Sequence, residues 1–94
     1  MLVIAHHDIQ DTEKFWAAAQ SLTAILPSHL KVLSVFPSMD MKTGTCIWEA
    51  PSVEEVQKFI DDNAGSISKN FCYQVNEAAA MGLPKVELDA AVHN

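Results

Sequence analysis

Residues 46–60 read CIWEAPSVEEVQKFI, and they contain the sharpest change of secondary structure in the chain. The first residues of this stretch are apolar and rich in strand-forming types, which is typical of a short buried strand. Pro51 keeps the residue before it extended. Ser52 and Glu55 form an S-x-x-E capping box, the pattern with which a helix begins. This corner predicts a strand over residues 45–50 that turns at once into a helix.

The chain before this corner predicts a strand, a helix and the first arm of a hairpin. Residues 2–7 are apolar and bounded by polar residues, as in a buried strand. Asp11 is suited to cap a helix over residues 11–26, whose apolar residues recur at helical spacing until Pro27 stops it. Residues 29–38 follow as a second strand, and a turn-rich segment connects them to the strand at the corner.

Two interpretations compete for the segment after the second helix. Residues 66–82 carry apolar residues at helical spacing, but aromatic and β-branched residues alternate over 71–76 as in a strand. We favour the strand, because a hairpin and one further strand make a poor sheet. Residues 85–94 alternate again and predict a short edge strand or a C-terminal arm that reaches a partner.

The resulting order, β-α-β-β-α-β with a C-terminal extension, is the ferredoxin-like arrangement of the α+β class. Both helices are expected on one face of a four-stranded antiparallel sheet. With 94 residues the chain is expected to form one domain, residues 1–94, of which 85–94 are the arm. Hydrophobic residues make up 49% of the chain, more than a small core hides, and this favours a homodimer.

The charge and the cysteines of the chain indicate which kinds of partner the protein binds and in which cellular compartment it is found. The net charge is −6, and all six basic residues are lysines. Nucleic acid and anionic membrane surfaces are attracted by basic patches, so neither is an expected partner. The N-terminus has no secretory leader, no apolar run reaches the length of a membrane span, and the two cysteines form no zinc or CxxC motif. We therefore expect a cytoplasmic protein.

Two stretches, CIWEAPSVEEV at 46–56 and YQVNEAAAMGLP at 73–84, resemble a family of small bacterial ferredoxin-like proteins of unassigned function, some of which bind nickel. More broadly the chain resembles the dimeric α/β-barrel superfamily, in which two such sheets close face to face. That superfamily includes cofactor-less monooxygenases and muconolactone-isomerase-like proteins. The resemblance implies a dimeric α/β barrel. It assigns no nickel ligand to any particular residue.

The alternation of strand residues divides the expected sheet into two faces. If the most apolar positions face the helices, the core face contains Leu2, Ile4, His6, Leu33, Val35, Cys46, Trp48, Phe71, Tyr73 and Val75. The other face then contains Val3, Ala5, His7, Val32, Ser34, Phe36, Thr45, Ile47, Glu49, Cys72, Gln74 and Asn76. A second copy closing over this mixed face would create a lined cavity between the sheets, the usual form of a small-molecule site. In this alignment the two cysteines lie on opposite faces and cannot form a disulfide.

Candidate site residues follow from this assignment. His7 is a candidate general base that Glu49 would orient. The expected ligand-binding residues on the same face are Ser34, Phe36, Ile47, Cys72 and Gln74. The expected metal ligands are His6, His7 and His29, which suit nickel or another divalent transition metal, although neighbouring residues of a regular strand point to opposite faces.

Three classes of function remain open at this point. The first is a small homodimeric protein that binds a metal ion or a small apolar ligand between its sheets. The second is a cofactor-less isomerase or monooxygenase-like enzyme with His7 as the base. The third is a protein–protein interaction module whose open face binds a different partner.

Overall fold

The computed structural model describes residues 1–84, so the expected C-terminal arm, residues 85–94, lies outside the described residues. The chain forms four strands and two helices in the order β-α-β-β-α-β. Their bounds are β1 Leu2–Ile9, α1 Thr12–Leu22, β2 Lys31–Pro37, β3 Thr43–Glu49, α2 Val53–Ala64 and β4 Ser68–Gln74. The strand interpretation of 71–76 is confirmed, although β4 begins three residues earlier than expected.

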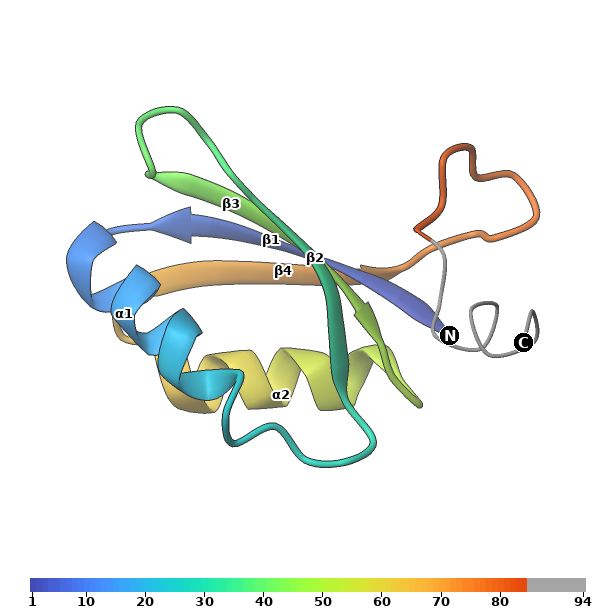
Figure 1. The fold of residues 1–94 in the computed structure, drawn as a ribbon, viewed down its shortest axis with the longest axis horizontal. Coiled ribbons are helices and arrows are strands. Elements are labelled where there is room, and N and C mark those ends of the chain that lie inside the picture. The colour runs from blue at the N-terminus through green and yellow to red at the C-terminus, as the bar shows by residue number, and fades with distance from the viewer. Residues whose placement is uncertain (85–94) are drawn as a thin grey trace.

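The four strands form one antiparallel sheet in the order β2-β3-β1-β4, with both helices on one face (Figure 1). This is the ferredoxin-like arrangement, and the prediction of the α+β class is confirmed. The outer surface of the sheet has no helix over it in this part of the chain (Figure 1). No helix within residues 1–84 combines the length and the apolar character that crossing a bilayer needs.

Both helices begin where their capping residues indicate. The Asp11 side chain accepts a hydrogen bond from the Lys14 backbone N–H, and the Ser52 hydroxyl accepts one from the Glu55 N–H. Helix α1 ends at Leu22, earlier than the expected stop at Pro27. Helix α2 ends at Ala64, and the next residue is Gly65, where a Cβ would lie 2.5 Å from a backbone oxygen of the last turn.

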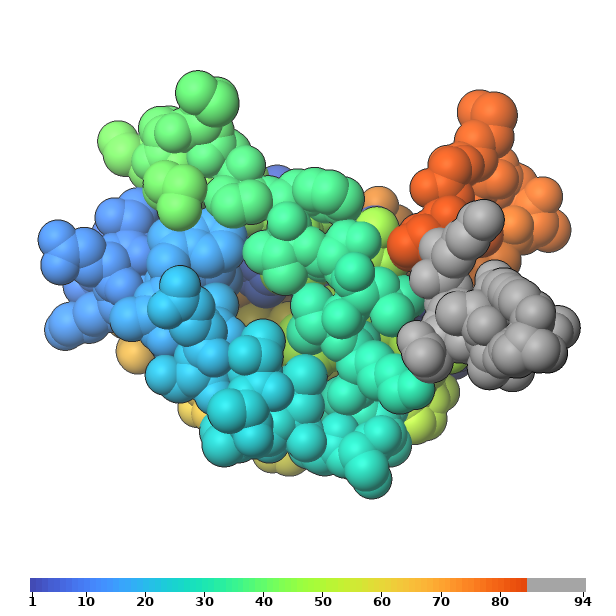
Figure 2. Space-filling view, in the orientation of Figure 1, coloured from blue at the N-terminus to red at the C-terminus, as the bar shows by residue number. Residues whose placement is uncertain are grey.

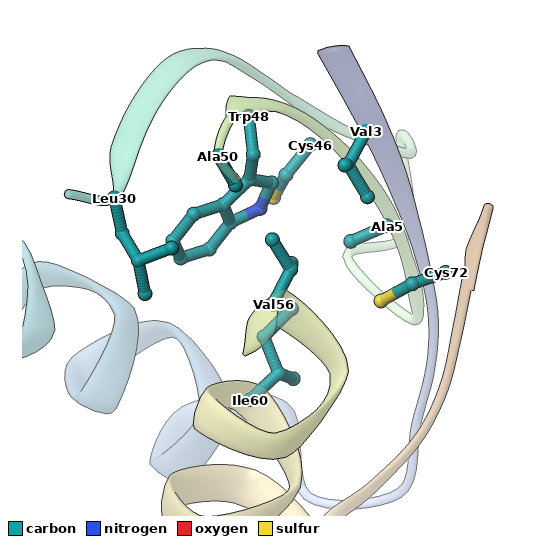
Figure 3. Packing of buried hydrophobic residues seen from close by; sticks show 9 residues of the cluster. All are labelled: Val3, Ala5, Leu30, Cys46, Trp48, Ala50, Val56, Ile60 and Cys72. Carbon is teal, nitrogen blue, oxygen red and sulfur yellow. The ribbon is translucent and has the colours of Figure 1, made fainter. Parts of the chain in front are cut away.

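The main core lies between β1, β3 and α2 (Figure 3). The buried members of this cluster are Val3, Ala5, Leu30, Cys46, Trp48, Ala50, Val56, Ile60 and Cys72. A second, smaller cluster of Ile9, Phe15 and Ala64 closes the end of the sheet near the start of α1. The residues of the main cluster come from segments far apart in sequence, so the core forms only when the strands pair.

The predicted assignment of faces is wrong for β1 and β4, and also for Val32 of β2, which packs against the main core. Val3, Ala5 and His7 point toward the helices and are buried, while Ile4 and His6 lie on the outer surface. Similarly Cys72 is buried, whereas Phe71 and Tyr73 are 63% and 47% exposed. The error has a physical reason: β1 is apolar on both faces through Ala5, so its hydropathy does not determine which face is covered. The strand partners decide the orientation, because Ala5 lies opposite Cys46 and Cys72.

We call the uncovered surface of the sheet the open face, and two rows of residues form its centre. One row consists of Ser34, Ile47, Ile4 and Tyr73, and the other of Phe36, Thr45, His6 and Phe71. Charged residues flank these rows in opposite-sign register pairs, Lys31 with Glu49 and Asp8 with Lys69. The open face therefore has an apolar, aromatic centre and a rim on which these charges balance.

Candidate functional site

A cavity of about 70 Å³ lies between α1, α2 and the sheet. Figure 2 shows the surface hollowed between α1 (blue to cyan) and β2 (blue-green). The lining residues are His7, Phe15, Trp16, Ala18, Ala19, Leu22, Thr23, Leu26, Val32, Val35, Cys46, Trp48, Phe59, Ile60 and Ala64. Ala18 and Ala19 are too small to fill the space between α1 and the sheet. Thr23 and Val35 line the cavity and are exposed, so they mark its opening.

His7 lines this cavity and is only 2% exposed. Its Nδ1 lies 2.8 Å from Asn70 Oδ1, and its Nε2 lies 3.3 Å from Cys46 Sγ. Asn70 comes from β4 and Cys46 from β3, the two strands that flank β1. A Cys–His–Asn hydrogen-bonded chain thus crosses three strands beneath α1.

The partners of Asn70 determine the tautomer of His7. The Asn70 Nδ2 group donates to Asp61 Oδ1 at 3.0 Å, so its Oδ1 faces the imidazole as an acceptor. His7 Nδ1 must then carry the proton and donate, which leaves a lone pair on Nε2. The Cys46 S–H donates a hydrogen bond to that lone pair. In this state His7 Nε2 is ready to act as a base toward the sulfur.

Burial keeps both reacting groups neutral. It lowers the pKa of His7, an effect that the Asn70 hydrogen bond partly opposes and the charge of His6 reinforces. Burial also raises the pKa of Cys46 to about 11, and the nearby Cys72 adds to the effect. The resting pair is therefore a thiol and a neutral imidazole, not a thiolate–imidazolium ion pair.

Two aromatic residues of α1 cover His7. The Phe15 ring lies 5.0 Å from the imidazole, measured between centroids, and packs edge-on against Trp16. Trp16 in turn lies against Gly44, where a Cβ would come within 3.0 Å of the indole. The Trp16 Nε1–H donates to the Met41 carbonyl of the β2–β3 hairpin. Gly44 therefore permits the close packing that seals this end of the cavity.

Trp48 also lines the cavity. Its Nε1–H is buried and has no hydrogen-bond partner among the described residues. Trp48 lies two residues after Cys46 on β3, so the two side chains are neighbours on the same face. Figure 3 shows the indole nitrogen at the edge of the ring nearer to Cys46 than to Leu30. An unpaired buried donor costs about 1–3 kcal/mol, which a bound acceptor would recover.

The structure does not bring the predicted catalytic pair together. His7 lies opposite Gly44, whereas Glu49 lies opposite Leu2, about 17 Å farther along the strand. The two side chains are also on opposite faces, because Glu49 alternates with the inward Trp48. Asn70 orients His7 instead, so the expectation that Glu49 orients the base is wrong.

The predicted ligand-binding residues divide between the two sides of the sheet. Ser34, Phe36 and Ile47 lie on the open face, as expected, and a second copy could cover them there. Cys72 points toward the helices, and Gln74 lies on the same side at the exposed edge of β4. A shared cavity between two sheets would not contain these last two residues.

The predicted metal ligands are not gathered either. His6 lies on the open face, His7 is buried on the other side, and His29 lies 3.0 Å from the Glu55 carboxylate. Within residues 1–84 no three or more His, Cys, Asp or Glu side chains lie close enough to hold a metal ion. The alternation of β1 separates His6 from His7, and β1 stays regular through both.

The two cysteines share one face, contrary to the expectation. Cys46 and Cys72 flank Ala5 from either side, so their Cα atoms are about 10 Å apart, beyond the reach of a disulfide. Both are free thiols. Only Cys46 has an imidazole partner, and the sequence predicted it simply as a residue of the core face.

Comparison of the chain with protein-family models, with curated proteins and with solved structures found no match. The ferredoxin-like fold therefore rests on the strand order and register described above. The resemblance to nickel-binding proteins and to dimeric barrels stays a prediction.

Proposed function

We propose that this protein binds a small apolar molecule that carries a hydrogen-bond acceptor, in the cavity between α1 and the sheet. The observation that carries the proposal is an almost entirely apolar cavity lined in part by Trp48, whose buried Nε1–H has no hydrogen-bond partner among the described residues. Binding sites of this kind combine apolar walls with a few directed polar groups. At about 70 Å³ the cavity suits a ligand of only a few heavy atoms.

We further propose that the binding protein is a homodimer joined through the open face. Phe36, Phe71 and Tyr73 are 59%, 63% and 47% exposed, a density of large apolar side chains unusual for a free surface. The two pairs of charged residues on the rim of this face have no net charge, although the whole chain has a net charge of −6. An apolar centre with a balanced rim suits a second copy of the same face, which an unbalanced charge would repel.

Butanone is a suitable probe for the cavity, because it is small, apolar and has one acceptor oxygen. We expect it to shift the Trp48 Nε1–H resonance in ¹H–¹⁵N spectra in a saturable manner. Ala19→Leu should fill the cavity, abolish this shift and raise the unfolding free energy by about 0.5–2 kcal/mol. Ala17→Leu is the matched control, because Ala17 is on the exposed side of the same helix.

If butanone shifts the resonance equally in wild type and in Ala19→Leu, the ligand binds elsewhere and the proposal is wrong. The absence of any saturable shift in the wild type would have the same meaning. A shift that is lost in Ala19→Leu and kept in Ala17→Leu supports the cavity as the binding site.

A further inference from the structure

Two residues of the cavity wall, Cys46 and His7, and Asn70 behind them together form a site for covalent chemistry. Cys46 supplies a nucleophilic atom, and His7 Nε2 lies 3.3 Å from its sulfur with a lone pair that accepts the thiol hydrogen bond. Asn70 orients the imidazole from the other side at 2.8 Å. A nucleophile, a base within hydrogen-bond reach and a group that orients the base are the parts of a cysteine-nucleophile site. Trp48 lines the same cavity, and its buried N–H has no hydrogen-bond partner among the described residues.

We propose that Cys46, with His7 as general base, adds to small α,β-unsaturated carbonyl compounds that enter the cavity. This inference rests on the proposed function, because the cavity must first admit a small apolar molecule. It adds the chemical class of the ligand, an electrophilic alkene conjugated to a carbonyl group. Asn70 is a positioning residue in this scheme, since it acts only through His7.

The spacing of the two groups on β3 favours this class over simple aldehydes. Cys46 and Trp48 are two positions apart along the strand, about 7 Å between Cα atoms. In a conjugated carbonyl the attacked carbon and the oxygen are separated by two further carbons, so one molecule can reach both groups. In an aldehyde the attacked carbon carries the oxygen directly, and both groups would have to converge on one bond.

The addition balances within the site. The Cys46 thiol proton moves to His7 Nε2 while a sulfur lone pair forms a bond to the β-carbon. The π electrons of the alkene move toward the carbonyl, and the enolate oxygen accepts the Trp48 Nε1–H. His7 Nε2–H then returns the proton to the α-carbon. The thiol has added across the double bond, and no oxidant or second reactant is consumed.

Neutrality of the resting pair makes the site selective. Because burial raises the pKa of Cys46 to about 11, almost no thiolate exists at neutral pH to react with exposed electrophiles or oxidants. Reaction requires His7 to take the proton during addition. Since burial lowers the pKa of His7 from 6.5, this base is already deprotonated at pH 7, and the rate should not change between pH 7 and 8.

Cys72 provides an internal control in the same molecule. It is 7% exposed against 8% for Cys46, and burial raises its pKa to about 11 as well. It neither lines the cavity nor contacts His7. Its reaction depends on free thiolate, so its rate should rise about tenfold from pH 7 to pH 8. Lys58 and Lys69 place the two cysteines in different tryptic peptides.

The experiment exposes the folded protein to but-3-en-2-one and measures the adduct at each cysteine by peptide mass spectrometry over time. We expect Cys46 to react at least tenfold faster than Cys72, with a rate constant that is the same at pH 7 and 8. In urea the two should react equally. His7→Gln should remove the preference for Cys46 without accelerating Cys72.

Equal rates in the folded protein, or a tenfold rise at Cys46 from pH 7 to 8, would overturn the proposal. The pH comparison uses the wild type alone, so it decides the question even if His7→Gln does not fold. Butanone, the saturated analogue, separates the two proposals. If butanone shifts the Trp48 resonance but the enone leaves Cys46 unmodified, the covalent step is wrong and the binding site stands. If butanone causes no shift of the Trp48 resonance and the enone leaves Cys46 unmodified, the proposed function is wrong as well.

Discussion

At the scale of single residues, the unusual feature of this protein is a buried imidazole with two dissimilar partners. His7 gains one hydrogen bond from its own N–H to Asn70 and accepts another from the Cys46 thiol. These bonds offset the cost of removing the ring from water, and they require it to be neutral. A protonated His7 could not accept the thiol proton, so the fold selects the neutral state.

The first prediction is that the protein loses stability in mild acid because of His7. Burial holds its pKa below 6.5 in the folded state, so the unfolded chain binds more protons as pH falls below 6.5. The His7 contribution is fully present above pH 6.5 and is lost as the pH falls toward the lowered pKa. The slope should approach about 1.4 kcal/mol per pH unit, the limit for one proton.

Urea unfolding at several pH values measures this slope. Groups around the ring include Cys46 and Asn70 in contact, Asp61 behind Asn70, and His6 on the other side of the sheet. His7→Gln should flatten the curve between pH 6.5 and 5. An unchanged slope in His7→Gln would show that another group titrates.

At the scale of elements, the edge strand β4 is held by a side chain of α2. Gln57 accepts a hydrogen bond from the Cys72 backbone N–H at 3.0 Å through Oε1. Its Nε2 donates to the Asn70 carbonyl at 2.8 Å. An edge strand exposes unpaired backbone groups, and here one helix residue satisfies two of them. Helix α2 thereby holds the strand that carries Asn70, the residue that orients His7.

The second prediction concerns this contact. Gln57→Ala removes both backbone partners and should lower the unfolding free energy by about 1–3 kcal/mol. Hydrogen exchange at the Cys72 amide should become faster than in the wild type. Gln20→Ala makes the same substitution on the exposed side of α1 and should leave that amide unchanged. If the Cys72 amide exchanges at the same rate in both variants, the Gln57 contact does not stabilise β4.

At the scale of the whole molecule, the sheet separates two environments. The covered side contains the cavity, the Cys46–His7–Asn70 chain and the core. The open side presents two mixed rows of apolar and polar residues without a helix over them (Figure 1). The chemistry proposed for Cys46 therefore does not depend on a second copy of the chain, whereas the proposed dimer forms through the open face.

The third prediction tests a homodimer. We expect the wild type to sediment as a dimer at micromolar concentration. Phe71→Lys places a charge in the apolar centre of the open face and should shift the protein to a monomer that stays folded. Ile25→Lys is the control, because Ile25 is 63% exposed in the segment after α1. A wild type that is monomeric would instead leave the open face for a different protein, as the interaction-module interpretation expects.

The sequence by itself determined the order and type of the elements, because those depend on local chemistry. The capping residues Asp11 and Ser52 mark helix starts through hydrogen bonds that span three residues. Pro51 and the apolar run before it establish the strand-to-helix corner. These patterns are readable in a short window, so the elements up to α2 followed from them, whereas the choice of a strand for β4 also needed the argument that the sheet would otherwise be poor.

Only the tertiary structure decided which face of each strand is covered and which residues meet there. His7 and Cys46 are 39 residues apart in the chain, and His7 and Asn70 are 63 apart. No periodicity relates positions at such distances, and β1 is apolar on both faces. Strand pairing places Ala5 between Cys46 and Cys72 and turns His7 toward the helices. The proposed site exists because three distant strands pair in one register, a property of the folded sheet that no single segment carries.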